Sequence, residues 1–338
     1  MTASLPRLQR GTTPRCGWPS DTFSIDYYVP FHDDVRIDVP HTVLVFVPGN
    51  PGLIEWYLSF FQQLLQRLGP GFAARGIAHA GHSLHPERIA PGSRSTTVAW
   101  TVEGQSMHKA AYVDHVLKEF REVAQKRRLA RQPKLIFVCH SVGTFFTQQL
   151  LMRRADILAR TELLIGLMPF IRMNAPWKQQ ILMDTLAAYQ AATIRIHELL
   201  SLALSKLPRS WVDRIMSSSI PDLTARSVAI DLACQYHFVK SFFSLGLEEI
   251  RDLPETVNAA PLRQCPTALL FAGNDQWAPE HHLDDLQRLK EGKLIPETVE
   301  WEYDPRLRHD FVVDDKQIEA ALDFCEKHIR QIHQKSRL

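Results

Sequence analysis

The stretch that most constrains the fold lies near the middle of the chain, where the apolar run KLIFV (134–138) leads into CHSVG (139–143). An apolar run, a sharp turn and then FFTQQLLMRR (145–154) predict a strand, a tight turn and a helix. Such a turn presents the hydroxyl group of Ser141 at the carboxyl edge of a sheet, where it can act as a nucleophile. The segment therefore predicts an α/β fold with a reactive serine.

The residues beside the serine fit this interpretation with one departure. The backbone N–H of Val142 would point at a developing oxyanion, and Gly143 would let the helix pack close to the strand. The position two residues before the serine is usually glycine, and here it is Cys139. The same letters also fit a buried strand that ends beside a serine at a helix N-terminus, so the motif needs support from other parts of the chain.

Composition limits the classes of function. With 338 residues the chain can bury one large core or two modest ones, and its net charge of +2 gives no basis for nucleic-acid binding. No run reaches the roughly 20 apolar residues of a membrane span. The cysteines lack CxxC spacing, which indicates reduced thiols in an intracellular compartment; they are Cys16, Cys139, Cys234, Cys265 and Cys325.

The two ends of the chain carry weaker signals. Residues 1–20 contain three arginines and no acid before Asp21, and we expect them to be disordered. The last three residues, Ser336-Arg337-Leu338, are a conservative variant of the SKL peroxisomal address. A peroxisome-type location is therefore kept as an alternative.

The first long apolar run, TVLVFV (42–47), is typical of a strand buried on both faces of a parallel sheet. It ends in PGNPG (48–52), a rigid loop at the carboxyl end of the strand. We expect the N–H of Asn50 to be the second oxyanion donor, paired with that of Val142. Without a serine nucleophile the same loop would be an ordinary tight turn.

Further strands are expected at similar spacing along the chain. An opening hairpin is predicted for 22–29 with 35–39, and the later strands for 71–78, 161–170, 266–273 and 296–303. Alternation of these runs with amphipathic helices predicts a mostly parallel central sheet flanked by helices. The core would comprise residues 21–173 and 256–335.

The alternation stops between 174 and 255, where long helical patterns such as 181–207 carry apolar residues on more than one face. We expect this segment to be a helical cap inserted into the core and placed over the site. Its apolar surface would meet lipid substrates or a lipid surface, unless it only packs on the core.

Three histidines, His79, His82 and His85, are spaced by threes after one predicted strand. No cysteine or carboxylate nearby completes a ligand set, so we expect no metal site and no cofactor. A loop at the mouth of the site is the preferred interpretation, with His82 as a candidate substrate-binding residue.

Two further residues complete a catalytic set with the serine. Asp275 and His309 each follow a predicted strand, as Ser141 does, so all three should project from one edge of a parallel sheet. His309 would take the proton of Ser141, and Asp275 would orient His309. Asp304 and Asp310 are the alternatives for the acid.

At this point the chain resembles the lipid-droplet-associated hydrolase family, within the α/β-hydrolase superfamily. The segments that carry the resemblance are VFVPGNPG (45–52), the aromatic helix from Glu55 to Phe61, AHAGHS (78–83), GQSMHK (104–109), CHSVG (139–143), GNDQWAP (273–279) and RHDFV (308–312). The resemblance implies a serine hydrolase of neutral-lipid esters, namely sterol esters or acylglycerols, with a role in lipid storage. It also implies attachment to lipid droplets or the endoplasmic reticulum through the cap.

Carried across residue by residue, Ser141 matches the nucleophile, Asp275 the acid and His309 the base. Two other functions stay open: a lipid-droplet surface protein with little turnover, and a peroxisomal esterase or thioesterase. A dehalogenase-like function is disfavoured because Ser141 stands where an aspartate nucleophile would be needed.

Overall fold

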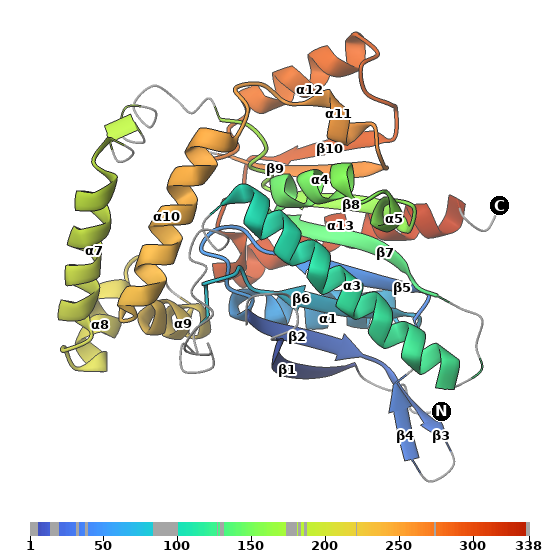
Figure 1. The fold of residues 1–338 in the computed structure, drawn as a ribbon, viewed down its shortest axis with the longest axis horizontal. Coiled ribbons are helices and arrows are strands. Elements are labelled where there is room, and N and C mark those ends of the chain that lie inside the picture. Colours follow the sequence, from blue (N-terminus) through green and yellow to red (C-terminus); the bar gives the residue numbers. More distant parts are fainter. Residues whose placement is uncertain are drawn as a thin grey trace.

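The central sheet of this computed structural model is mostly parallel (Figure 1). The structure describes residues 6–13, 20–31, 34–37, 40–83, 101–126, 128, 132–173, 181, 184–185, 188–220, 222–273 and 275–335. Within these residues eight strands follow the spatial order β1-β2-β6-β5-β7-β8-β9-β10. Their bounds are β1 Arg7–Thr13, β2 Ser20–Asp26, β5 Thr42–Val47, β6 Phe72–Ile77, β7 Lys134–His140, β8 Thr161–Leu167, β9 Thr267–Ala272 and β10 Val299–Asp304.

In this spatial order, the strands β6, β5, β7, β8, β9 and β10 run parallel to one another. At one edge β1 pairs antiparallel with β2, and β2 pairs antiparallel with β6. The predicted α/β class with a mostly parallel sheet is therefore confirmed. Every residue of β5 and β9 is buried, as expected of continuous apolar strands that are covered on both faces.

The N-terminal region differs from the sequence-based expectation. Instead of disorder throughout 1–20, Arg7–Thr13 form β1, which pairs with β2 and brings Leu8 against the core. Instead of one opening hairpin, β2 joins the main sheet, and β3 (Tyr28–Phe31) pairs with β4 (Asp34–Ile37) in a separate small sheet. Composition carries no record of such pairing, because backbone groups make the hydrogen bonds.

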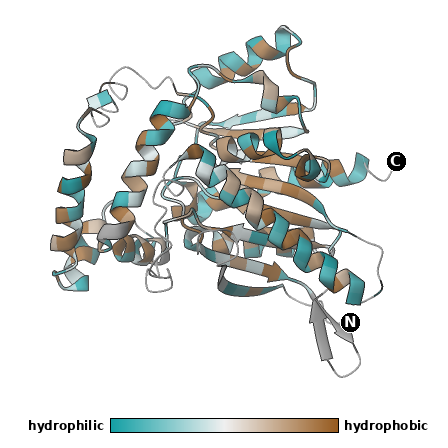
Figure 2. Cartoon of the chain, in the orientation of Figure 1, coloured by the Kyte–Doolittle hydropathy of each residue, from teal (hydrophilic) through white to brown (hydrophobic). Residues whose placement is uncertain are grey.

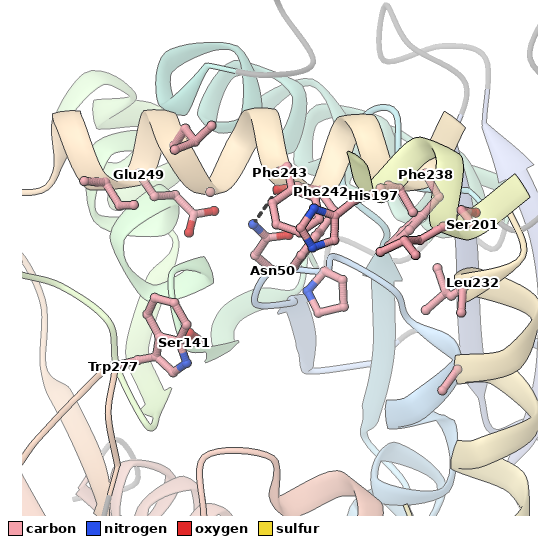
Figure 3. A pocket seen from close by; sticks show the side chains of 18 of the residues that line it. Asn50, Ser141, His197, Ser201, Leu232, Phe238, Phe242, Phe243, Glu249 and Trp277 are labelled. Atoms are coloured by element: carbon pink, nitrogen blue, oxygen red, sulfur yellow. Dashed lines mark hydrogen bonds between the residues drawn. The ribbon is translucent and has the colours of Figure 1, made fainter. Parts of the chain in front are cut away.

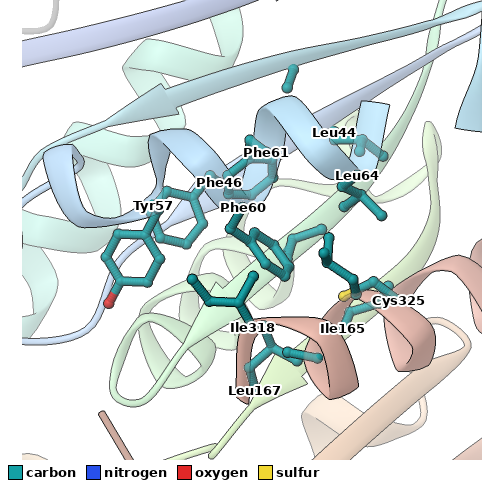
Figure 4. Packing of buried hydrophobic residues seen from close by; sticks show 14 of the residues in the cluster. Leu44, Phe46, Tyr57, Phe60, Phe61, Leu64, Ile165, Leu167, Ile318 and Cys325 are labelled. Atoms are coloured by element: carbon teal, nitrogen blue, oxygen red, sulfur yellow. The ribbon is translucent and has the colours of Figure 1, made fainter. Parts of the chain in front are cut away.

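Helices α1 (Leu58–Leu68) and α13 (Asp315–Lys335) cover one face of the sheet (Figure 4). Phe60, Phe61 and Leu64 of α1 are fully buried against the sheet and α13. Helix α1 ends at Gly69, whose N–H donates to Leu65 O. The φ of Gly69 is +81°, a positive value that glycine adopts without strain because it has no Cβ atom.

The opposite face is covered by α3 (Val102–Lys126), α4 (Gly143–Arg153) and the short α5 (Ala155–Leu158). Beside β9 and β10 lie α11 (Ala259–Leu262) and α12 (His281–Glu291), as Figure 1 shows. The sheet is thus enclosed on both sides, which leaves its carboxyl edge as the place where side chains can meet a ligand.

Between β8 and β9 the chain forms five described helices; α11 lies beside β9 and β10, and the other four stand beside this edge (Figure 1). We call α7–α10 the helical insertion; the bounds are α7 Gln190–Leu204, α8 Arg209–Met216, α9 Leu223–Ala233 and α10 Tyr236–Asp252. Within the helix expected over 181–207, α7 spans Gln190–Leu204 with Tyr189 as its N-cap, and the described residues 181, 184, 185 and 188 are also helical. The cap boundaries at 174 and 255 stay a prediction.

The insertion carries hydrophobic residues at the margin of the molecule, far from the sheet (Figure 2). Asp222 caps α9 by accepting the Ala225 N–H, while Pro208 precedes α8. Among the helices that the structure describes, none combines the length and the apolar character needed to cross a bilayer.

Candidate active site

Ser141 lies in the turn between β7 and α4, with a φ of +52°. This left-handed backbone is strained for a residue with a side chain, and the Ser141 N–H stabilises it by donating to Leu167 O at 2.9 Å. A Cβ atom at position 143 would lie 2.4 Å from the carbonyl oxygens of Val47 and Pro48, so only glycine fits there. The turn therefore has the strand-to-helix geometry that the sequence predicts.

Cys139 occupies the position where such turns usually have glycine, and it is fully buried between the sheet and α4. Its Sγ lies 3.2 Å from Thr147 Oγ1, which itself donates to Gly143 O at 2.9 Å. The thiol must then be the donor to Thr147, in keeping with a Cys139 pKa that burial raises to about 12. The cysteine in place of the usual glycine is therefore packed in the core, and the turn at Ser141 keeps its geometry.

The structure brings His309 and Asp275 to Ser141. His309 Nε2 lies 2.9 Å from Ser141 Oγ, and His309 Nδ1 lies 2.7 Å from Asp275 Oδ2. Asp275 follows β9, and His309 lies between β10 and the short helix η3 (Phe311–Val313). Three segments that are distant in sequence therefore converge at the carboxyl edge of the sheet.

Hydrogen bonds define the protonation of this set. Burial alone would raise the pKa of Asp275, but His309 and the backbone N–H groups of Ala278 and Trp277 hold that pKa below its usual value. The carboxylate is thus ionised and only accepts hydrogen bonds, so Nδ1 of His309 carries the proton. Nε2 is left to accept the hydroxyl proton of Ser141, as a general base requires.

The two other candidate acids lie elsewhere. Asp304 pairs with Arg306 at 2.6 Å, and Asp310 pairs with Arg308 at 2.7 Å. Both pairs are at least partly exposed, whereas the side chain of Asp275 is completely buried. Of the three carboxylates, Asp275 is the one that contacts His309.

The loop after β5 lies directly against the serine. A Cβ atom on Gly49 would approach Ser141 Cβ to 2.7 Å, so this glycine is required by the contact. The next residue, Asn50, lines the same cavity as Ser141, while Val142 immediately precedes α4. The side chain of Asn50 donates to Phe242 O of α10 at 3.1 Å, which ties the loop to the helical insertion.

His140 and Tyr57 support the site in a way that the sequence analysis does not identify. His140 is buried, and burial together with the neighbouring His309 lowers its pKa to about 3, so its ring is neutral. His140 Nε2 lies 2.8 Å from His309 O and must donate to it, and Nδ1 then accepts the Tyr57 hydroxyl proton at 2.7 Å. This chain holds the backbone of His309 in place.

His82 lies outside the cavity lining, although the sequence makes it a candidate for substrate binding. It is fully buried, and its Nδ1 lies 2.6 Å from Pro51 O, next to Asn50. Its ring packs against His79 and Phe238. His82 therefore holds the 48–52 loop in place from the side away from the cavity. His85 falls outside the described residues.

Ser141 and His309 open into a cavity of about 600 Å³ between the sheet edge and the helical insertion (Figure 3). Most of its lining is apolar and comes from α7, α9 and α10, with Phe170 and Trp277 contributed by loops of the core. The polar side chains in the lining are those of Asn50, Ser141, His197, Ser201, Glu249 and His309. A nucleophile and base at the base of an apolar cavity can react with an apolar ester.

A model of the family described as lipid-droplet associated hydrolase matches residues 40–312. The lipid droplet-associated hydrolase of Gallus gallus is 19% identical over 313 residues, which cover 91% of each chain. That of Homo sapiens is 30% identical over 135 residues, and this match spans 38% of the chain and 37% of the human protein.

Among solved structures, a peroxisomal alpha-beta-hydrolase from Saccharomyces cerevisiae superimposes with a TM-score of 0.59 at 11% identity. The alignment covers 100% of this chain and 92% of the yeast chain. At this identity the likeness shows the fold alone, and that fold is the α/β-hydrolase fold expected from the sequence.

Proposed function

The chain belongs to the lipid-droplet associated hydrolase family, and from this premise we propose that it hydrolyses carboxylic esters of neutral lipids with Ser141 as nucleophile. The observation that carries the proposal is the contact of His309 with both Ser141 and Asp275, at 2.9 and 2.7 Å, beside an apolar cavity. Sterol esters and acylglycerols are the substrates proposed, with a role in lipid storage.

The reaction follows from the protonation of the three side chains. His309 Nε2 removes the proton of Ser141 Oγ as this oxygen attacks the ester carbonyl carbon. Asp275, ionised and bonded to Nδ1, stabilises the imidazolium that forms. The tetrahedral oxyanion accepts hydrogen bonds from the N–H groups of Asn50 and Val142, each contributing about 3 kcal/mol in comparable sites.

Collapse of this intermediate breaks the ester C–O bond, and His309 gives its proton to the departing alcohol. The acyl group stays on Ser141 until water, deprotonated by His309, attacks it and releases the carboxylic acid. His140 and Tyr57 act indirectly, because they hold the carbonyl group of His309.

The helical insertion supports attachment to a lipid droplet. On α7 the cavity-lining residues His197, Leu200, Ser201 and Leu204 recur at helical spacing. Ile196 and Leu199 lie on another side of the same helix and are more than half exposed. A helix that is apolar on both sides contacts the substrate cavity with one side and is free to contact a lipid surface with the other.

Helix α8 adds to this exposed surface. Trp211 and Ile215 are four residues apart, so they share one face, and they are 64% and 60% exposed. We call Ile196, Leu199, Trp211 and Ile215 the apolar outer surface, and we propose that it contacts the lipid droplet. The endoplasmic reticulum membrane is a second possible site of attachment with the same physical chemistry.

A second function is favoured by the same surface. If the apolar outer surface is the main functional feature, the protein would be a lipid-droplet surface protein with little turnover. A peroxisomal location through Ser336-Arg337-Leu338 is a further alternative; these residues lie outside the described part of the chain. Masking the C-terminus with a fusion tests it, since an unchanged location would remove the idea.

The test of the catalytic proposal is labelling of the purified protein with a fluorophosphonate probe, followed by assays on neutral-lipid esters. Wild type should label, whereas Ser141→Ala and His309→Ala should not. Ser59→Ala, which removes an exposed serine on α1, is the matched control and should label like wild type. If folded wild type fails to label, the surface-protein function gains the support that catalysis loses.

A further inference from the structure

The mechanism above gives no role to Glu249, a polar side chain in the cavity. Glu249 is the only carboxylic acid among the described residues that line the cavity. It lies on α10, is 5% exposed, and its Oε1 has no hydrogen-bond partner. Figure 3 shows its carboxyl group pointing from α10 into the space that also holds Ser141 and Trp277.

Glu249 faces the cavity because of its position on α10, since successive residues of a helix point in different directions. The preceding residue, Glu248, faces outward and forms an ion pair with Arg251 at 2.8 Å. Among the described residues no such cation pairs with Glu249. The side chain of Asn50, whose Nδ2 donates one N–H to Phe242 O, also interacts with this carboxyl group, and Oε1 is left without a partner. A buried polar group left without a partner destabilises the protein, so its presence here needs a reason.

Burial makes this group a hydrogen-bond donor. It raises the pKa of Glu249 to about 8, against the opposing contribution of the Asn50 contact, so the group is neutral at pH 7. A protonated carboxyl group donates through its O–H and accepts through its carbonyl oxygen. A hydroxyl group has the same two capacities and is therefore its natural complement within an apolar cavity.

We propose that Glu249 binds a hydroxyl group of the substrate, so that the preferred substrates are neutral-lipid esters that retain a free hydroxyl group. This proposal rests on the ester-hydrolase function above and narrows its substrate class. The hydroxyl group can come from the alcohol part, as in a partial acylglycerol, or from a hydroxylated acyl chain. A sterol ester of an ordinary fatty acid offers no such group and would leave Oε1 of Glu249 unpaired.

The expected discrimination is large, because a site that hydrogen-bonds a hydroxyl group leaves its buried polar atoms unpaired when the hydroxyl is absent. We expect kcat/KM to be about tenfold or more higher for an ester with the hydroxyl group than for its O-methyl ether. The ether keeps the carbon skeleton and an acceptor oxygen but loses the donor.

The experiment uses two matched substrate pairs with the full-length protein. The first pair is a diacylglycerol and its O-methyl ether, and the second is a glycerol ester of a hydroxy fatty acid and of the corresponding methoxy acid. The variants are Glu249→Gln, which keeps a donor and an acceptor, and Glu249→Leu, which removes both. Glu248→Gln is the matched control from the adjacent, outward-facing position.

The proposal expects a hydroxyl preference in wild type and Glu248→Gln, most of that preference in Glu249→Gln, and a ratio near one in Glu249→Leu. The pair that shows the preference identifies the hydroxyl-bearing part of the substrate. Circular dichroism of each variant verifies folding, and Glu249→Met, which also removes the donor and the acceptor, takes the place of Glu249→Leu if that variant does not fold.

Hydrolysis of both members of each pair at equal kcat/KM in wild type would overturn the inference and leave the ester-hydrolase function intact. A preference that persists unchanged in folded Glu249→Leu would do the same. Absence of ester hydrolysis and of fluorophosphonate labelling in folded wild type would instead overturn the hydrolase function, and the inference with it.

Discussion

Helix α1 of the core and helix α7 of the insertion are both rich in apolar residues, but they place them differently. α1 buries Phe60, Phe61 and Leu64 completely, whereas α7 leaves Ile196 and Leu199 more than half exposed. The apolar residues of α1 therefore stabilise the fold. Those of α7 are available to the cavity and to a lipid surface, so the insertion has apolar area beyond what folding uses.

The same contrast holds for polar groups. At the sheet edge each side chain of the proposed triad has a hydrogen-bond partner, and the neighbouring His140 bonds through both of its nitrogens. In the insertion Glu249 Oε1 has none. The core thus holds the proposed reacting groups in place through hydrogen bonds. The insertion has a buried acceptor without a hydrogen-bond partner and exposed apolar residues, which a substrate or a lipid surface can contact. Four predictions test this division, from the largest effect to the smallest.

The largest effect is expected at the sheet edge. Asp275→Asn should lower kcat on a water-soluble ester by about four orders of magnitude, because an amide no longer holds His309 in the tautomer that frees Nε2. Asp310→Asn, the matched control at the alternative acid, should change kcat little. Comparable losses in both variants would contradict the assignment of Asp275.

In the core, Phe61→Ala should lower the free energy of unfolding by about 3–5 kcal/mol, because it opens a cavity under α1. Leu199→Ala, a truncation on the outer side of α7, should change it by about 0.5 kcal/mol or less. Urea denaturation followed by circular dichroism measures both. Similar losses in the two variants would show that the insertion is as much part of the stable core as α1.

A third prediction concerns pH. Glu249 has a pKa of 4.5 in the unfolded chain and about 8 in the folded protein. Between these values the unfolded state binds fewer protons, so stability falls as pH rises through this window and levels off above pH 8. Each unit of pKa difference corresponds to about 1.4 kcal/mol, which makes this dependence measurable.

Glu249→Gln removes this titration. Melting temperatures at pH 5 and pH 8 should therefore converge more closely in the variant than in wild type, and the variant should gain most at pH 8. Glu248→Gln should follow wild type. An unchanged pH dependence in Glu249→Gln would mean that this carboxyl group ionises normally in the folded protein.

The smallest effect is expected on the apolar outer surface. Trp211→Ser combined with Ile215→Ser should lower binding to phospholipid-coated triolein droplets by about tenfold, or about 1.4 kcal/mol. A lipid surface would bury only part of each side chain, and full burial of one contributes roughly 1.5–3 kcal/mol. Flotation of labelled protein with the droplets measures the bound fraction. Met107→Ser on α3, also exposed, is the control; equal losses there would mean that binding is not localised to the insertion.

The sequence alone determined the class of fold and the places of its main strands along the chain, whereas their order in the sheet came from the structure. Continuous apolar runs such as 42–47 and 134–138 are buried on both sides only in a sheet that is covered on both faces. This property can be read from each run by itself, without reference to other segments. The glycine at 143 and the serine at 141 similarly specify a sharp turn without reference to other segments.

Position along strands also identified Ser141, Asp275 and His309 as the residues to bring together, because each follows a strand that ends at the same edge. The sequence did not indicate which of the N-terminal strands pair with each other or with the main sheet. There β1 and β2 associate through backbone hydrogen bonds, which any side chain permits, so the expectations of disorder and of a single hairpin differed from the structure.

Only the tertiary structure decided which neighbours act on these residues. Tyr57 and His140 are separated by 83 residues, and no local pattern links a phenol on a helix to the carbonyl group of His309. Glu248 and Glu249 are identical in type and adjacent in sequence, yet one pairs with Arg251 outside and the other faces the cavity. Helix rotation and the packing of α10 over the sheet edge decide which glutamate is buried, because burial depends on contacts between segments rather than on either residue.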